Sequence, residues 1–181
     1  MNANRICPPL VALLASGCAS TVTVPAAPPA FPAGWEGTWR GSLRSAGGSA
    51  PMEVEMTLEV RAAEAGNWAW VITYADPAGT QVRDYRLVAR DAGQGQYEID
   101  ERNGIVLPVR WLDGVLLAEF EVQGSRVTVR EELRSEESGL LVEMATFAAG
   151  APSTTGGGAV PEVRGWAPVS LQRGTLRRVR R

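Results

Sequence analysis

The most regular feature of the chain is a series of short segments in which apolar and polar residues alternate. In residues 52–60 the apolar side chains fall on one face, and three glutamates and a threonine fall on the other. Residues 67–74 place two tryptophans, an isoleucine and a tyrosine on one face in the same way. Side chains alternate between the two faces of a β-strand, whereas a helix would scatter them around its circumference. The pattern therefore predicts strands.

Further alternating segments follow, separated by the pairs Asn103-Gly104, Asp113-Gly114 and Gln123-Gly124, which are typical of hairpin turns. They cover residues 81–90, 96–100, 105–111, 115–122, 126–134, 140–147 and 169–179. With an opening strand after residue 34 they add up to about ten strands. Pro108 within one of them indicates an edge or a bulge. Because closure hides the open edges of a sheet, we expect an all-β fold: a single antiparallel up-and-down barrel of about 8–10 strands.

Residues 148–168 do not show this alternation of apolar and polar residues. They are rich in glycine, proline, serine and threonine. The composition predicts a loop longer than most compact domains carry. Such a loop is either a linker that returns the last strand to the first or a lid over a pocket mouth, with Trp166 as the part that packs.

The amino-terminal residues have a different pattern. Residues 6–16 form an apolar run behind Arg5 that is short for a membrane span and suits a secretory signal. The stretch "LLASGCAS" at its end resembles the lipobox of bacterial lipoproteins, which are cleaved before a lipid-bearing cysteine. This resemblance implies a signal peptide at residues 1–17 and lipidation of Cys18. The alternative is an ordinary thiol in a simple secreted signal.

The same resemblance implies a location in the bacterial cell envelope. The two residues after Cys18 lack the aspartate that tends to retain lipoproteins at the inner membrane, which implies the outer membrane, facing the periplasm. Residues 18–33 are mostly small residues and prolines, so they predict a tether between the membrane and a domain at residues 34–181.

The start of that domain, "GWEGTWRGSL", carries a second resemblance. Gly37-Thr38-Trp39 resembles the G-x-W signature of the calycin superfamily, which contains lipocalins, fatty-acid-binding proteins and avidins. In these proteins the tryptophan closes one end of the barrel and packs against an arginine from the last strand. The resemblance implies that Trp39 meets Arg173 or Arg177. The alternative is that Trp35 and Trp39 are core residues of an open sheet or sandwich.

The composition and the net charge limit the kinds of catalytic, metal and nucleic-acid site that this chain can form. The chain contains no histidine, which removes the commonest general base, the commonest metal ligand and the Ser-His-Asp triad. The carboxylates of residues 98–102 and of Glu131-Glu132 lie in segments where charged and apolar residues alternate, as on a solvated outer face. The formal net charge of -2 argues against a nucleic-acid partner. We expect no enzymatic activity, no metal and no cofactor.

Three charged residues, Arg83, Glu131 and Arg173, nevertheless lie on the same face of their strands as the apolar side chains. They form a buried Arg–Glu pair, face outward through a register slip, or bind a ligand. The resemblance to fatty-acid-binding proteins implies that an arginine near Tyr85 binds a carboxylate. We expect non-enzymatic binding of a small apolar or amphipathic ligand, or else a filled barrel that serves as an envelope interaction module. The residues expected to line the interior are Trp68, Trp70, Arg83, Tyr85, Phe120, Glu131, Met144 and Arg173.

Overall fold

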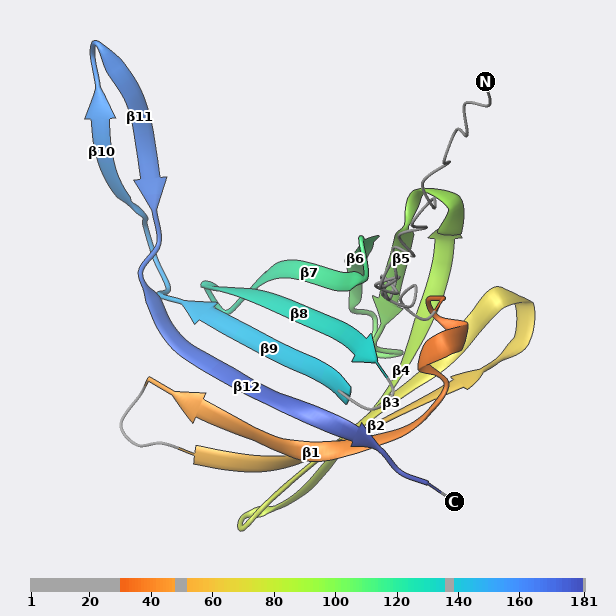
Figure 1. Cartoon of the computed structure of the whole chain (residues 1–181). Helices are drawn as coiled ribbons and strands as arrows, with labels where there is room; N and C mark the ends of the chain where they lie inside the picture. Colours follow the sequence, from red (N-terminus) through yellow and green to blue (C-terminus); the bar gives the residue numbers. More distant parts are fainter. Residues whose placement is uncertain (1–29, 48–51, 136–138, 181) are drawn as a thin grey trace, which may run out of the picture.

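The computed structural model describes residues 30–47, 52–135 and 139–180, and it is built almost entirely from antiparallel strands (Figure 1). The strands are β1 (Gly37–Ala46), β2 (Met52–Ala62), β3 (Asn67–Asp76), β4 (Gly79–Asp91), β5 (Gln96–Asp100), β6 (Val106–Leu112), β7 (Val115–Val122), β8 (Ser125–Ser135), β9 (Gly139–Phe147), β10 (Ser153–Gly157), β11 (Val160–Gly165) and β12 (Pro168–Arg178). Three short 3₁₀ turns accompany them: η1 (Ala33–Trp35), η2 (Glu64–Gly66) and η3 (Ala92–Gln94).

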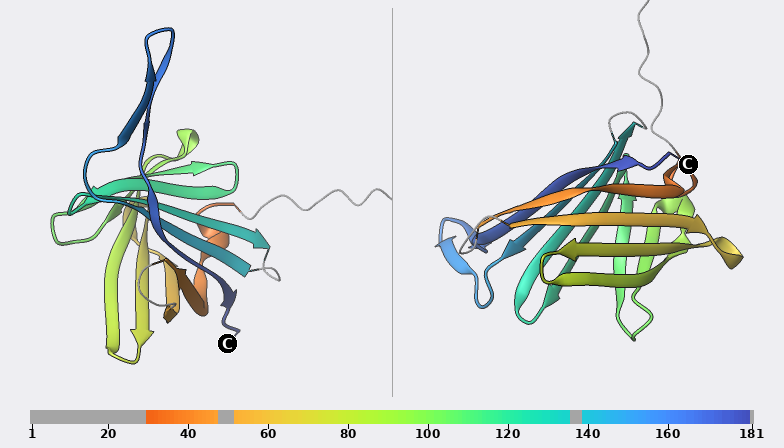
Figure 2. Two further views of the ribbon diagram at one scale, coloured as in Figure 1. Left: turned by 90° about the vertical axis from the view of Figure 1, so that its left-hand side faces the viewer. Right: turned by 90° about the horizontal axis from the view of Figure 1, so that it is seen from below.

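Strands β1–β9 and β12 form one closed barrel (Figures 1 and 2). Each of the first nine strands pairs with its neighbours along the chain, and β12 closes the barrel by pairing with β9 on one side and β1 on the other. The prediction of an all-β, antiparallel, up-and-down barrel is confirmed. Closure leaves none of these ten strands with an open edge.

The barrel closes along a seam, the ladder in which β1 pairs with β12. Glycines at two positions allow the two strands to approach each other there. A Cβ at Gly41 would lie 3.2 Å from Leu176 Cα, and one at Gly174 would lie 2.8 Å from Leu43 Cδ2. Both glycines lie where the two backbones approach each other closely, and this proximity excludes a side chain.

Two of the predicted hairpins have the expected turn geometry. Asp113 and Gly114 have φ values of 45° and 87°, and Gln123 and Gly124 have values of 50° and 77°. Two successive residues with positive φ are the mark of a type I′ turn, whose twist matches that of the flanking strands. Asn103-Gly104 instead lies within a longer connection between β5 and β6.

The irregularity predicted at Pro108 lies on the side of β6 that faces β7. The ladder between these strands runs from the Leu112–Val115 pair to the Val109–Ala118 pair, so it stops immediately next to Pro108. Proline has no N–H to donate to a ladder, which accounts for the end of the pairing. On the β5 side Pro108 remains in register with Glu98.

The loop predicted at residues 148–168 is instead a hairpin of two strands, β10 and β11, which projects away from the barrel (Figures 1 and 2). All residues from Ser153 to Arg164 are exposed. The two strands contain two threonines and two valines, whose branched side chains favour extended backbone despite the surrounding glycines. Trp166 packs at its base, where the Arg126 guanidinium carbon lies 4.2 Å from the centre of the indole ring.

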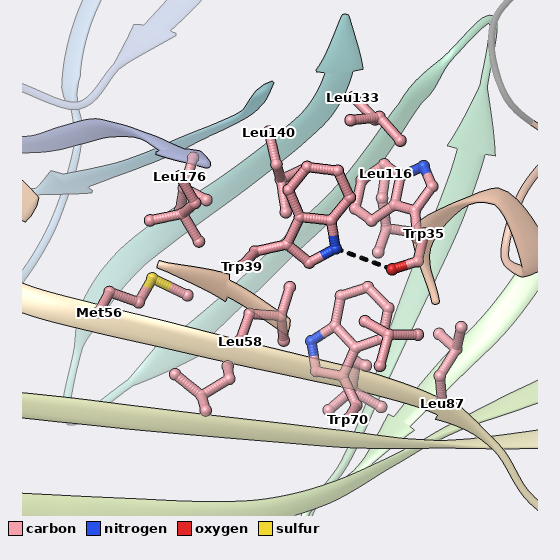
Figure 3. Packing of buried hydrophobic residues seen from close by; sticks show 14 of the residues in the cluster. Trp35, Trp39, Met56, Leu58, Trp70, Leu87, Leu116, Leu133, Leu140 and Leu176 are labelled. Atoms are coloured by element: carbon pink, nitrogen blue, oxygen red, sulfur yellow. Dashed lines mark hydrogen bonds between the residues drawn. The ribbon is translucent and has the colours of Figure 1, made fainter. Parts of the chain in front are cut away.

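One end of the barrel is filled with large apolar side chains (Figure 3). Trp35, Trp39 and Trp70 are at most 2% exposed, and leucines from several strands surround them. The predicted tether boundary at residue 33 is wrong, because Phe31 also belongs here: its ring stacks on Trp111 with 4.4 Å between centres. Residues 1–29, including Cys18 and the predicted signal peptide, lie outside the described residues.

Candidate functional site: a cavity inside the barrel

Trp39 lies within the filled end of the barrel. Its indole Nε1 donates a hydrogen bond to the carbonyl oxygen of Trp35 at 2.8 Å, and its side chain is fully buried. The guanidinium carbon of Arg178 lies 4.7 Å from the ring centre. Arg178 Nη2 also donates to the carbonyl oxygen of Gly34 at 3.0 Å.

The closing arginine is therefore Arg178, and the prediction of Arg173 or Arg177 is wrong. Trp39 lies directly opposite Arg178 in the register of β1 and β12. Because side chains of a strand alternate, Arg178 shares the inward face with the buried Leu176, while Arg173 and Arg177 belong to the other face.

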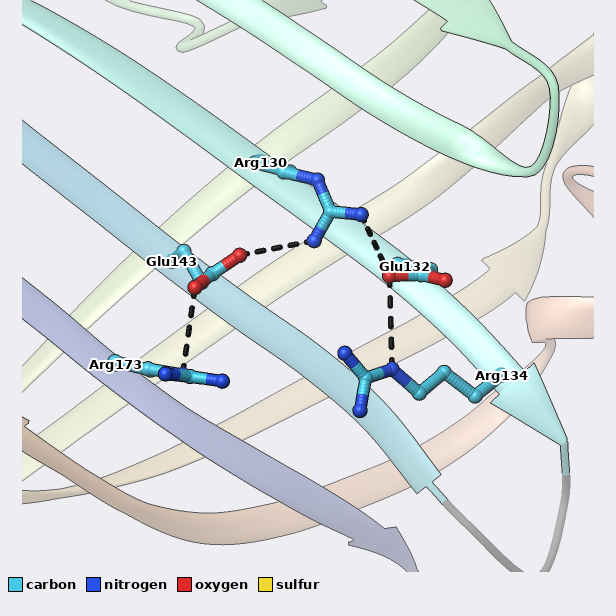
Figure 4. A network of polar contacts seen from close by, with 5 residues as sticks. All are labelled: Arg130, Glu132, Arg134, Glu143 and Arg173. Carbon is cyan, nitrogen blue, oxygen red and sulfur yellow. Dashed lines mark hydrogen bonds and ion pairs between the residues drawn. The ribbon is translucent and has the colours of Figure 1, made fainter.

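The prediction that Arg173 faces the interior is wrong for the same reason. Its Nε lies 3.3 Å from Glu143 Oε1 on the outer surface, in an ion-pair network that Figure 4 shows. Arg130 joins Glu143 to Glu132 there, at 2.9 and 2.7 Å. The misleading signal was Leu171, which is apolar but 40% exposed on the outer face of β12.

A cavity of about 120 Å³ lies between the filled end and the opposite end of the barrel. Most of its lining is apolar. Of the eight residues predicted to face the interior, six border this cavity: Trp70, Arg83, Tyr85, Phe120, Glu131 and Met144. Trp68 does not, because it packs against the filled end, where its Nε1 donates to Glu36 Oε1 at 3.3 Å.

Two polar residues that line the cavity were missing from the prediction. Tyr74 continues the inward face of β3, and Glu101 continues the inward face of β5 just beyond the end of that strand. Glu101 could have been predicted, because the alternation of β5 continues to the first residue after the strand.

Glu131 is the most unusual group in the cavity. It is only 6% exposed, and its neighbours across the two adjoining ladders are Leu116 and Val142, which also line the cavity. Its Oε2 has no hydrogen-bond partner among the described residues. Burial raises the pKa of this carboxyl from its ordinary 4.5 to about 7, because the apolar surroundings disfavour the charged form.

The Arg–Glu pair that the sequence left open does not form within the described part of the chain. Arg83 is exposed, and it donates to Tyr85 Oη at 3.5 Å and to Gln81 Oε1 at 3.3 Å. Its guanidinium carbon lies 5.2 Å from the centre of the Tyr74 ring. The arginine therefore marks the open end of the cavity, while Glu131 lies in its buried part.

Tyr74 connects these two charges. Burial raises its pKa to about 12, the positive charge of Arg83 opposes this increase, and the negative charge of Glu131 adds to it. Tyr85 also has a raised pKa, chiefly through burial, with Arg83 opposing and Glu101 adding. Both phenols therefore stay protonated at neutral pH and are able to donate hydrogen bonds.

Among the described residues, no group of three or more histidine, cysteine, aspartate or glutamate side chains is placed to hold a metal ion. Within the same ranges, no helix has the length and apolar character needed to cross a membrane. Comparisons with protein-family models, with curated proteins and with solved structures give no match to this chain.

Proposed function

We propose that this protein binds a small, largely apolar or amphipathic ligand inside its barrel, without catalysing a reaction. The observation that carries the proposal is the cavity itself, which is apolar over most of its lining and contains polar groups only at a few points. Ligand sites of soluble proteins share this composition, in which apolar walls supply affinity and a few polar groups set orientation. The volume of about 120 Å³ restricts the ligand to a small molecule.

We further propose that the chain is a lipoprotein of the bacterial cell envelope, anchored in the outer membrane and facing the periplasm. The support for this is the lipobox-like stretch ending at Cys18, together with the small-residue and proline-rich segment that follows it. The barrel end that receives this segment is the filled one, so a tethered barrel would present its open end away from the tether.

Ligand binding is tested by filling the cavity. Ala118 lines the cavity from β7, and Ala118→Phe should abolish the binding of a small neutral apolar probe such as toluene, measured by isothermal titration calorimetry. Leu117→Phe is the matched control, because Leu117 follows Leu116 on the opposite face of the same strand. Circular dichroism establishes that each variant is folded, and native mass spectrometry of the wild type detects any co-purified molecule.

Equal probe binding by wild type and Ala118→Phe would contradict the proposal. So would the absence of both a co-purified ligand and probe binding in the wild type. The latter result would favour the alternative of a filled barrel that acts as an interaction module of the envelope, which the modest cavity volume also allows.

The anchor is tested separately through Cys18. In cells, Cys18→Ala should prevent both labelling by a radioactive fatty acid and cleavage of the signal peptide. Normal processing and continued membrane association of this variant would contradict lipidation.

A further inference from the structure

The buried carboxyl group of Glu131 indicates what kind of ligand the cavity accepts. A polar group without a partner in an apolar site is unfavourable, and proteins rarely retain one unless it has a role. The side chain is 94% buried and lines the cavity, and Oε2 has no partner in the described structure. A ligand that donates a hydrogen bond or a positive charge to Glu131 would remove this cost.

The other charges of the cavity favour a cation over an anion. Besides its tyrosines, the cavity is lined by three ionisable residues, Arg83, Glu101 and Glu131. When all three are ionised, their sum is one net negative charge. Arg83 is exposed at the open end, so its charge is well solvated, whereas that of Glu131 is not. A carboxylate ligand with its head group in the deep part would meet a like charge.

The aromatic lining points in the same direction. Trp70, Tyr74, Tyr85 and Phe120 all border the cavity. Aromatic faces attract ammonium groups through their quadrupoles, and this attraction grows when the cation is removed from water. The volume of about 120 Å³ is of the same order as an engineered cavity that holds benzene.

We infer that the ligand is a small amine with an aromatic or short aliphatic body, whose ammonium group pairs with Glu131 in the deep part of the cavity. This inference rests on the proposed binding function. It differs from the carboxylate ligand that the resemblance to fatty-acid-binding proteins implied. The reason is that the buried ionisable group is the carboxyl of Glu131, whereas Arg83 lies at the open end of the cavity.

The test compares three ligands of nearly identical shape: benzylamine, benzyl alcohol and benzoate. Isothermal titration calorimetry at pH 7.5 should give an affinity for benzylamine at least tenfold higher than for benzyl alcohol, and no measurable binding of benzoate. Glu131→Gln, which keeps the shape of the side chain, should lose at least tenfold in benzylamine affinity and little in benzyl alcohol affinity. Glu132→Gln is the matched control, because Glu132 is the next residue and pairs with Arg130 outside the barrel.

The outcomes separate the inference from the proposed function. Benzoate as the tightest ligand, equal affinities for the amine and the alcohol, or no effect of Glu131→Gln on benzylamine would overturn the amine inference and leave apolar binding intact. If none of the three ligands binds and the apolar probe does not bind either, the proposed function fails as well. Should Glu131→Gln be unfolded, Glu131→Leu provides a second variant with the same expectation.

Affinity should also depend on pH. Benzylamine pairs with the ionised carboxylate, and burial raises the pKa of Glu131 to about 7, so affinity should fall severalfold from pH 8 to pH 6. The other ionisable groups lining the cavity are Tyr74, Tyr85, Arg83 and Glu101, and the two tyrosines have raised pKa values. The dependence should persist in Glu101→Gln and vanish in Glu131→Gln. If the dependence vanishes in Glu101→Gln instead, the ammonium group binds at Glu101 and not at Glu131.

Discussion

At the scale of single residues, Arg178 holds the filled end of the barrel together. It lies over the Trp39 ring and donates to the Gly34 carbonyl oxygen, so it ties the last strand to the segment before the first one. Arg173, five residues earlier on the same strand, makes an ion pair with Glu143 on the outer face, and its side chain is 57% exposed.

We therefore predict that Arg178→Ala lowers the free energy of unfolding by about 1–3 kcal/mol, through loss of the cation–π contact and of a partly buried hydrogen bond. Arg173→Ala should lower it by less than about 1 kcal/mol, because exposed ion pairs contribute little. Urea unfolding followed by tryptophan fluorescence measures both. Equal losses would mean that the end of the barrel does not depend on Arg178.

Glu131 should make the stability of the protein depend on pH. Below about pH 4.5 the carboxyl is protonated in both the folded and the unfolded chain, so its burial carries no ionisation cost. Between 4.5 and about 7 the unfolded chain releases the proton while the folded chain retains it, so the free energy of unfolding falls as pH rises. Above about 7 both states are ionised and the cost stays constant.

Glu131→Gln should therefore be more stable than the wild type at pH 8, by up to about 3 kcal/mol, and equal to it at pH 4. Thermal or urea unfolding across this pH range, without ligand, measures the difference. Glu132→Gln, on the outer face, should not produce it. A difference between wild type and Glu131→Gln that is the same at pH 4 and pH 8 would show that folding does not raise the pKa of Glu131.

The sequence predicted the inward residues well where apolar side chains marked one face of a strand throughout. This was so for β3, where Trp70 and Ile72 border the cavity. On β12 the pattern misled, because the strand carries exposed apolar residues at its start and a glycine at the inward position 174. Whether Glu131 Oε2 finds a hydrogen-bond partner among the described residues depends on three-dimensional neighbours, and no pattern within one strand predicts it.

At the scale of elements, the alternation fixes where strands lie, but it does not reveal close contact between two backbones. Gly174 lies on β12 next to β1, and a Cβ there would come within 2.8 Å of Leu43 Cδ2, while the backbone at Ser42 is closer still. We predict that Gly174→Ala lowers the free energy of unfolding by at least about 2 kcal/mol, because the seam has no room for the methyl group.

Gly165→Ala provides the control for the seam. Gly165 also lies in a strand, but the nearest atom to its Cβ would be Ser153 Oγ at 3.5 Å, an ordinary contact. It should change stability by no more than about 0.5 kcal/mol. If the two substitutions have similar effects in urea unfolding, the closing strands separate more easily than the structure indicates.

The hairpin of β10 and β11 escaped prediction for a related reason. Its strands lie against each other and not on the barrel core, so neither has a buried face to impose alternation. Residues 153–165 contain four glycines and a proline, while their threonines and valines carry the signal for extended backbone.

At the scale of the whole molecule, closure of the barrel followed from the sequence, because about ten amphipathic strands in series leave few other ways to hide two edges. The extent of the domain did not follow. The proline- and alanine-rich composition before residue 34 predicted a tether, but its one aromatic residue, Phe31, packs into the filled end among Trp35, Tyr97 and Trp111. A single anchoring side chain is invisible to a composition argument.

This packing predicts where a stable domain must begin. A chain that starts at Gly37 lacks Phe31 and the fully buried Trp35, and it leaves the buried indole N–H of Trp39 without its acceptor. Loss of a buried aromatic residue costs about 3–5 kcal/mol, and an unsatisfied buried donor adds about 1–3 kcal/mol.

We expect the chain that starts at Ala30 to match the full-length protein in urea unfolding. The chain that starts at Gly37 should lose at least about 3 kcal/mol or fail to fold. Phe31→Ala in the longer chain should fall between the two, since Trp35 remains. Equal unfolding midpoints for the two chains would mean that residues 30–36 belong to the tether and not to the folded domain.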